Sequence, residues 1–181
     1  NIDSGNISVI SSIHTDLWFD MNPQGDTLVF VKNIGHNTAI FTIPLDSNAS
    51  PIRLSYETDS RNPVFSTDGS LVIYTARDRF GNKNLFSVKP DGTNYNRITS
   101  FNDPADIIFP IGASFIDSTI LYVMYSQTQN EKLEIWSINI NGSNDKFLSF
   151  CTLDGDDRPR LSPNGNKVLF QNDYNLWTMN I

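Results

Sequence analysis

The sequence predicts an all-β fold made of four repeats of a small antiparallel sheet. Turn glycines recur at Gly25, Gly69 and Gly165, and Asp117 replaces the glycine in the third repeat, so the successive steps are 44, 48 and 48 residues. An aromatic residue follows each landmark by five positions, and the segments between them alternate with the period of two expected for strands. No run of ten or more residues has the helical period. A self-similar unit of this length, made of strands only, indicates an array of small sheets.

The second repeat carries signals for four strands. The expected strands are an inner strand from Pro63 to Ser66, a second from Leu71 to Thr75, a third from Leu85 to Val88 and an outer strand from Asn96 to Thr99. Asp-Gly steps form two of the turns, where positive backbone angles are needed, and residues 78–84 form a polar loop. Four antiparallel strands in about 40 to 45 residues are typical of a propeller blade. We therefore predict a β-propeller with four blades of four antiparallel strands.

The two ends of the chain are expected to meet in one blade. The last repeat stops at its third strand, residues 176–181, whereas an additional strand from Ile7 to Ser11 opens the chain. Ile10-Ser11 aligns with three pairs in the outer strands of the other repeats, namely Leu54-Ser55, Ile98-Thr99 and Leu148-Ser149. The N-terminal strand is therefore predicted to complete the last blade, which removes exposed sheet edges.

The segments at residues 61–100 and 157–181 resemble the WD-like repeats of the TolB family of propellers. Both contain proline, an apolar residue and serine before an Asn-Gly or Asp-Gly turn, followed by an apolar strand and an aromatic strand. The resemblance divides a single domain, residues 1–181, into repeats at about 14–57, 58–101, 102–151 and 152–181 plus 1–13. Because such propellers usually have six or more blades, the chain is either a small closed ring or part of a longer propeller, and the matching ends favour the ring. The resemblance also implies a periplasmic or secreted location.

Composition limits the classes of partner. The chain of 181 residues is 39% hydrophobic and has no long apolar segment, so no membrane span is expected. Asp and Glu outnumber Lys and Arg by 20 to 13, which gives a net charge of −7. This acidic balance, without a cluster of basic residues, argues against nucleic acid as a partner.

Candidate catalytic residues are sparse. His14 and His36 are the only histidines and lie in different predicted loops, and no serine stands in a Gly-x-Ser-x-Gly motif. A Walker loop, a Gly-x-Gly-x-x-Gly motif and paired cysteines are also missing, since Cys151 is the single cysteine. We predict no enzymatic activity, no catalytic residues and no cofactor.

The densest charged segment is Asp-Gly-Asp-Asp-Arg at residues 154–158, in a connection between an outer strand and the next inner strand. Equivalent connections hold Asp59, Arg61 and Asp106, and in a propeller they open onto one face around the central channel. Three interpretations stay open: turn-forming aspartates that pair with nearby arginines, a calcium or other cation site, and a docking surface for a basic or amide-rich peptide. We prefer the docking surface for a peptide, and we assign no metal ligands.

Aromatic residues are expected mainly between blades, because they recur at equivalent strand positions. Trp18 differs, since it occupies an inner-strand position where the second repeat has Asn62 and the fourth has Arg158. We expect Trp18 either to line the channel opening or to pack in the core. The predicted partner-binding residues are Trp18, Asp59, Arg61, Asp106, Asp154, Asp156, Asp157 and Arg158.

These observations favour a non-catalytic scaffold whose loops at one opening of the ring bind a protein or peptide, as the resemblance to TolB implies. Two alternatives remain: a substrate-gating propeller of a larger hydrolase or peptidase, and an oligosaccharide-binding propeller.

Overall fold

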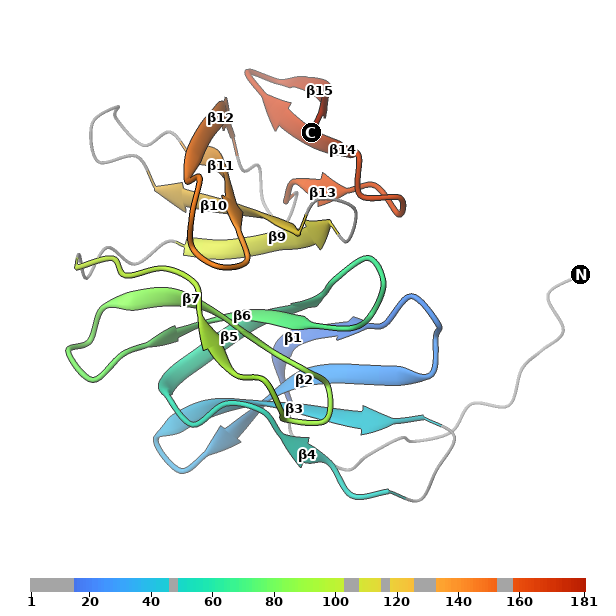
Figure 1. Cartoon of the computed structure of the whole chain (residues 1–181), viewed down its shortest axis with the longest axis vertical. Coiled ribbons are helices and arrows are strands. Elements are labelled where there is room, and N and C mark those ends of the chain that lie inside the picture. Colours follow the sequence, from blue (N-terminus) through green and yellow to red (C-terminus); the bar gives the residue numbers. More distant parts are fainter. Residues whose placement is uncertain (1–14, 46–48, 103–107, 115–117, 126–132, 153–157) are drawn as a thin grey trace, which may run out of the picture.

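The computed structural model describes residues 15–45, 49–102, 108–114, 118–125, 133–152 and 158–181. These residues form four antiparallel sheets and no helix, so the predicted all-β class is confirmed (Figure 1). The predicted strand from Ile7 to Ser11 lies outside the described residues. The described part of the chain contains no helix that is long and apolar enough to cross a membrane.

Three sheets have four strands and the last has three, and each sheet is built from strands that follow one another in the chain. The first sheet contains β1 (Thr15–Met21), β2 (Thr27–Ile34), β3 (Asn37–Pro44) and β4 (Ile52–Arg53). The second contains β5 (Thr58–Phe65), β6 (Val72–Arg77), β7 (Lys83–Val88) and β8 (Asn96–Arg97). The third contains β9 (Ile108–Ser114), β10 (Thr119–Tyr125), β11 (Leu133–Asn139) and β12 (Lys146–Cys151). The fourth contains β13 (Arg160–Leu161), β14 (Lys167–Asn172) and β15 (Asn175–Asn180).

The strands of the second sheet differ in length from the prediction. The inner strand β5 begins at Thr58 instead of Pro63, because two bulges let it pair with β6 over a longer distance. The connection between β6 and β7 is correspondingly short, residues 78–82, and β8 ends at Arg97. Asp59 and Arg61, which were expected in a connecting loop, therefore lie within β5.

Apolar cores lie between consecutive sheets. One cluster joins the first and second sheets, with Val29 and Ile40 packed near Val72. A second joins the second and third sheets, and a third joins the third and fourth. The side chains of each strand alternate between the two faces of its sheet. The second and third sheets, which each have a neighbouring sheet on both faces, therefore contribute to two cores. The four sheets thus pack in chain order, as Figure 1 shows.

The recurring aromatic residues are paired directly across neighbouring strands. The four pairs are Phe30–Phe41, Tyr74–Phe86, Tyr122–Trp136 and Phe170–Trp177. The rings of Tyr74 and Phe86 stack with their centroids 5.6 Å apart. Tyr74, Tyr122 and Phe170 each belong to the core between their own sheet and the preceding one, so the predicted packing role of this set is confirmed.

Polar contacts between sheets also repeat. The Thr42 hydroxyl of the first sheet donates a hydrogen bond to the carbonyl oxygen of Pro90, at 2.7 Å. One repeat later, the Asn96 side-chain amide donates to the carbonyl oxygen of Ile140, at 3.0 Å. In both cases the turn after the third strand of one sheet contacts the third or fourth strand of the preceding sheet. The geometry of these turns and the packing of the sheets therefore depend on each other.

Candidate functional site

Four residues from the inner strands, or from the segment leading into an inner strand, meet at one place. They are Trp18 of β1, Asn62 of β5, Phe109 of β9 and Arg158, which precedes β13; we call them the inner-strand cluster. The Arg158 guanidinium carbon lies 3.7 Å from the centroid of the Trp18 ring and 4.7 Å from that of Phe109. Its Nη1 atom donates to Oδ1 of Asn62 at 3.3 Å. One arginine of the last repeat therefore contacts the other three sheets.

Bulges in β5 place Asn62 in this cluster. The register with β6 shifts once between Thr58 and Arg61 and again between Arg61 and Val64. Asp59 and Asn62, one in each shifted stretch, have positive φ angles of 51° and 52°. Asp and Asn adopt this left-handed conformation more readily than most residues, and a bulge changes the direction of the side chains around it. The residue types at these two positions thus permit the local bends of β5.

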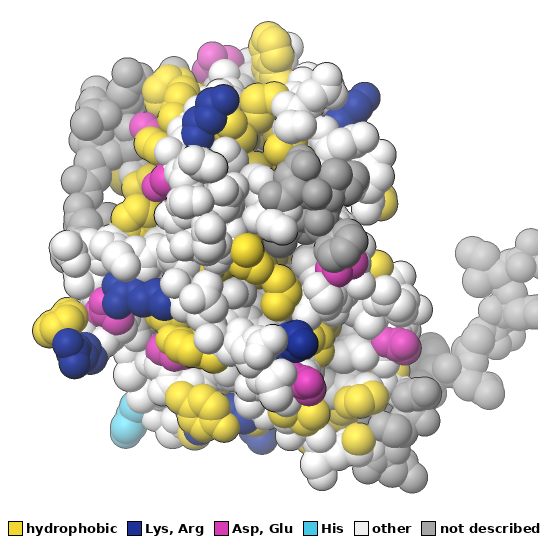
Figure 2. Space-filling view, in the orientation of Figure 1, with side chains coloured by type: hydrophobic (Ala, Val, Ile, Leu, Met, Phe, Trp, Pro, Cys, Tyr) yellow, Lys and Arg dark blue, Asp and Glu magenta, His cyan; other side chains and the backbone are white. Residues whose placement is uncertain are grey.

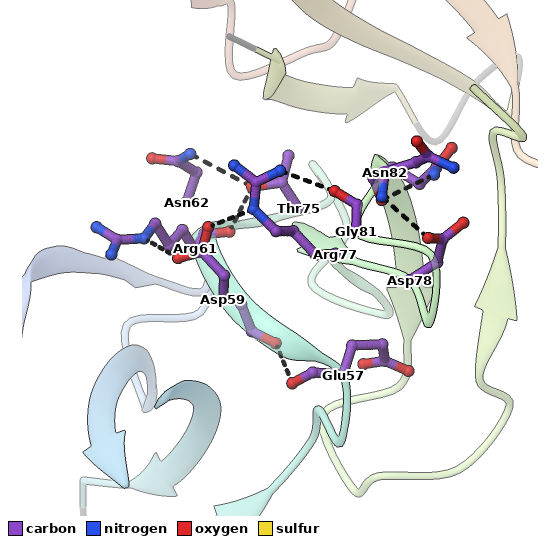
Figure 3. Close-up of polar contacts among 11 residues, drawn as sticks. Glu57, Asp59, Arg61, Asn62, Thr75, Arg77, Asp78, Gly81 and Asn82 are labelled. Carbon is purple, nitrogen blue, oxygen red and sulfur yellow. Dashed lines mark hydrogen bonds and ion pairs between the residues drawn. The ribbon is translucent and has the colours of Figure 1, made fainter. Parts of the chain in front are cut away.

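A second group, which we call the acid–arginine cluster, consists of Asp59, Arg61 and Arg77. The Asp59 carboxylate pairs with Nε of Arg61 through one oxygen and with Nε of Arg77 through the other, at 3.2 Å. Arg77 also donates to the carbonyl oxygen of Gly81 at 2.8 Å. Figure 3 shows that these side chains lie next to Asn62, so the acid–arginine cluster adjoins the inner-strand cluster.

Partial burial tends to raise the pKa of Asp59. The hydrogen bonds from Arg61 and Arg77 and the positive charges of Arg61 and Lys83 outweigh this effect. The pKa of Asp59 is therefore held below its ordinary value. A carboxyl group whose pKa is lowered in the folded state stabilises the fold above its unfolded pKa. This contribution is lost as the pH falls through the folded-state pKa. Asp59 is therefore bound in ion pairs at neutral pH, which agrees with the interpretation that aspartates here pair with arginines.

The structure brings together four of the eight predicted partner-binding residues as two pairs. Trp18 contacts Arg158, and Asp59 contacts Arg61. The other four, Asp106, Asp154, Asp156 and Asp157, lie outside the described residues.

The predicted partner-binding residues leave out three residues that take part, namely Asn62, Phe109 and Arg77. Phe109 was missed because the third repeat departs most from the common pattern, so its inner strand could not be aligned residue by residue. Arg77 was missed because it stands at the end of β6, beside a loop expected to be polar and solvated. Asn62 had been aligned with Trp18 and Arg158, and this alignment was the signal that could have predicted the cluster.

The two clusters consist of acidic, cationic, amide and aromatic side chains. His36 is exposed in the turn between β2 and β3 and is remote in sequence from every residue of both clusters. Burial raises the pKa of the Cys151 thiol to about 12, so the thiolate needed of a nucleophile is disfavoured. No group of three or more metal-ligating side chains occurs within the described part of the chain. Cationic, amide and aromatic groups are present instead, and these can contact a polar ligand.

Repeated antiparallel sheets of three or four strands that pack in chain order, with residues at or just before their inner strands meeting in one cluster, define a β-propeller type of repeat protein. The family model described as TolB beta propeller domain matches residues 1–179. The chain therefore belongs to the TolB β-propeller domain family. Comparison of the sequence with curated proteins finds no match.

Several solved structures share this fold. The structure of TolB from Acinetobacter baumannii matches with a TM-score of 0.70 and 21% identity, covering 99% of this chain and 44% of that one. A putative TolB from Agrobacterium tumefaciens matches with a TM-score of 0.64 and 19% identity, covering 78% and 52%. Tricorn protease matches with a TM-score of 0.64 and 13% identity, covering 91% and 21%. The chain thus spans about half the length of the two TolB structures.

Replacing Arg158 by lysine is expected to lower the free energy of unfolding by about 1–2 kcal/mol. Lysine keeps the charge but has no planar group to stack between Trp18 and Phe109. Urea unfolding followed by tryptophan fluorescence measures the change. The matched control is Arg160→Lys, because Arg160 is exposed, and its effect should stay within about 0.5 kcal/mol. Equal effects of the two substitutions would contradict the stacking role.

Proposed function

We propose that this chain is a non-catalytic scaffold that binds a protein or peptide through the loops next to the inner-strand cluster. The observation that carries the proposal is the convergence of Trp18, Asn62, Phe109 and Arg158 from four sheets beside the ion-paired Asp59. A surface assembled from several repeats offers many independently variable contacts on a rigid support, which suits recognition of a macromolecule.

The proposed architecture is a single domain, residues 1–181, in which the four sheets are blades of one ring. The N-terminal strand supplies the fourth strand of the last blade. Closure of the ring would cover the outward face of the fourth sheet. In the described residues this face is open, since Leu169 and Leu176 are 44% and 77% exposed, whereas their counterparts Ile73 and Leu85 are buried between the second and third sheets. The proposed closure is supported by the common step of 44 residues between Ile10, Leu54 and Ile98.

The proposed partner is a basic or amide-rich protein segment. Asp154, Asp156 and Asp157 precede Arg158 directly in the sequence, and Asp106 precedes Phe109 by three residues. These acidic residues would attract basic groups toward the inner-strand cluster. Nucleic acid is disfavoured by the net charge of −7, and Figure 2 shows Lys and Arg side chains singly placed among acidic ones on the face in view. No cofactor is proposed, and a cation at the channel opening remains a weaker alternative.

The periplasm or the extracellular space is the proposed location, and it rests on membership of the TolB domain family.

The alternative function is that of a substrate-gating propeller in a larger hydrolase or peptidase. Its support is the similarity of the fold to tricorn protease, of which this chain covers 21%. Oligosaccharide binding is a further alternative, for which Trp18 beside arginine and aspartate residues would provide the contacts.

The proposal is tested by capturing partners on immobilised chain from an extract of the source cells and identifying them by mass spectrometry. The test variant carries Asp154→Asn, Asp156→Asn and Asp157→Asn. The control carries Asp26→Asn, Asp91→Asn and Asp173→Asn, which remove the same number of charges from turns between strands of the same sheet. We expect a partner that the unmodified chain and the control retain and the test variant loses. Equal capture by all three chains would remove residues 154–157 from the site.

A further inference from the structure

Arg158 occupies a place in the inner-strand cluster that residues of the other three sheets surround. Its guanidinium carbon lies 3.7 Å from the centroid of the Trp18 ring and 4.7 Å from that of Phe109, and its Nη1 atom donates to Oδ1 of Asn62 at 3.3 Å. Arg158 itself belongs to no strand, because β13 begins at Arg160. The two aromatic rings and the amide oxygen around the guanidinium are therefore supplied by the first, second and third sheets.

These three residues are held in position by contacts of their own. Trp18 packs against the core between the first and second sheets. Phe109 is only 6% exposed and belongs to the core between the third and fourth sheets. The Asn62 side-chain amide donates to Oγ1 of Thr75 at 3.4 Å, and Thr75 is fully buried. Removal of the Arg158 side chain would thus leave two aromatic rings and a carbonyl oxygen already placed for a ligand.

Two aromatic rings and an amide oxygen in this arrangement suit a guanidinium group. A guanidinium is planar, stacks on aromatic rings and donates from several N–H groups in its plane, whereas an ammonium group is compact and strongly hydrated. Trp18, Asn62 and Arg158 are each partly exposed, so a solute can reach this place from the solvent. The net charge of −7 on the chain favours a cation over an anion as the ligand.

We propose that Trp18, Asn62 and Phe109 form a binding site for an arginine side chain. The chain's own Arg158 fills this site, and an arginine of a binding partner replaces it. The part that concerns a partner rests on the proposed function and makes it more specific, since the basic segment would present arginine rather than lysine. Arg158 is tethered to the site and competes at an effective concentration on the order of millimolar, so a partner needs further contacts to replace it.

The tripeptide acetyl-Gly-Arg-Gly-amide, added to the whole chain carrying Arg158→Ala, tests the proposal. We expect the thermal midpoint to rise by about 2–4 °C once the peptide is in excess of its dissociation constant. The matching peptides with citrulline or lysine should raise it clearly less, because citrulline has no charge and lysine has no planar group to stack. In the ¹⁵N-labelled variant, the indole N–H signal of Trp18 should move with the arginine peptide.

Two further chains serve as controls. Arg160→Ala removes an exposed arginine and keeps Arg158, so the arginine peptide should not raise its thermal midpoint at the same concentrations. The unmodified chain should need at least about tenfold more arginine peptide to move the Trp18 signal, because the tethered Arg158 competes. Arg158→Gln, which keeps most of the side-chain length without the charge, takes the place of Arg158→Ala if the alanine variant does not fold.

Two results would overturn the inference, and they differ in meaning. Equal midpoints with the arginine, citrulline and lysine peptides would overturn the guanidinium site. A Trp18 signal that responds in Arg158→Ala but stays unchanged in the unmodified chain at every peptide concentration would overturn the replacement of Arg158 by an external arginine. Neither titration uses a partner protein, so its failure leaves the docking function to the capture experiment, and failure of that experiment leaves the guanidinium site intact.

Discussion

Replacing Tyr74 by alanine is expected to lower the free energy of unfolding by about 3–5 kcal/mol. The Tyr74 side chain is fully buried in the core between the first and second sheets and stacks on Phe86. Its hydroxyl donates to Oε2 of Glu57 at 3.1 Å. Alanine removes the ring, leaves a cavity between two sheets and takes a donor from Glu57. Equilibrium unfolding in urea, followed by circular dichroism, measures the loss.

Tyr74→Phe is the matched control for this prediction. Phenylalanine keeps the ring and removes only the hydroxyl, so the expected cost is about 1 kcal/mol. Phe30 and Phe170 already occupy the equivalent positions in the first and fourth repeats, which indicates that the site accepts phenylalanine. If alanine and phenylalanine cost the same, the aromatic layer between the sheets would not carry the stability attributed to it.

Replacing Gly142 by alanine is expected to cost about 2–4 kcal/mol. Gly142 has a φ angle of 82° in the turn between β11 and β12, and an added Cβ would lie 2.5 Å from the carbonyl oxygen of Ile98. That oxygen belongs to the backbone of the second sheet, so the clash can be relieved only by moving the turn or the sheet. The thermal midpoint and the urea midpoint should both fall.

Gly35→Ala separates the clash from the backbone strain. Gly35 also has a positive φ angle, 61°, but no atom lies within 4 Å of its added Cβ. Its cost should be limited to the strain of a left-handed alanine, about 1–2 kcal/mol. Equal costs at Gly35 and Gly142 would show that the turn does not press against Ile98.

The strands could be predicted largely from the sequence because their signals are local. Alternating apolar residues and the recurring turn landmarks located the second and third strand of every repeat, and the aromatic pairs such as Tyr74–Phe86 lie in register. The bounds of β5 could not be predicted, since Asp59 and Asn62 interrupt the alternation at two bulges. Such bulges depend on contacts with β6 and the neighbouring sheets, which the alternation does not contain.

The candidate site was predicted in part. The alignment of Trp18, Asn62 and Arg158 at one inner-strand position anticipated that they share a place in the fold, and the structure shows their contacts. The roles of Phe109 and Arg77 required the tertiary structure, because the third repeat is irregular and Arg77 contacts Asp59 from the neighbouring strand β6.

The sequence by itself determined the all-β class and the family, because both depend on residue types at regular steps along the chain. The tertiary structure alone decided that the Arg158 guanidinium contacts the first three sheets and that Asp59 is held in ion pairs. The physical reason is that a repeat pattern specifies neighbours within a sheet, whereas contacts near the centre of the array depend on how twisted sheets pack against one another.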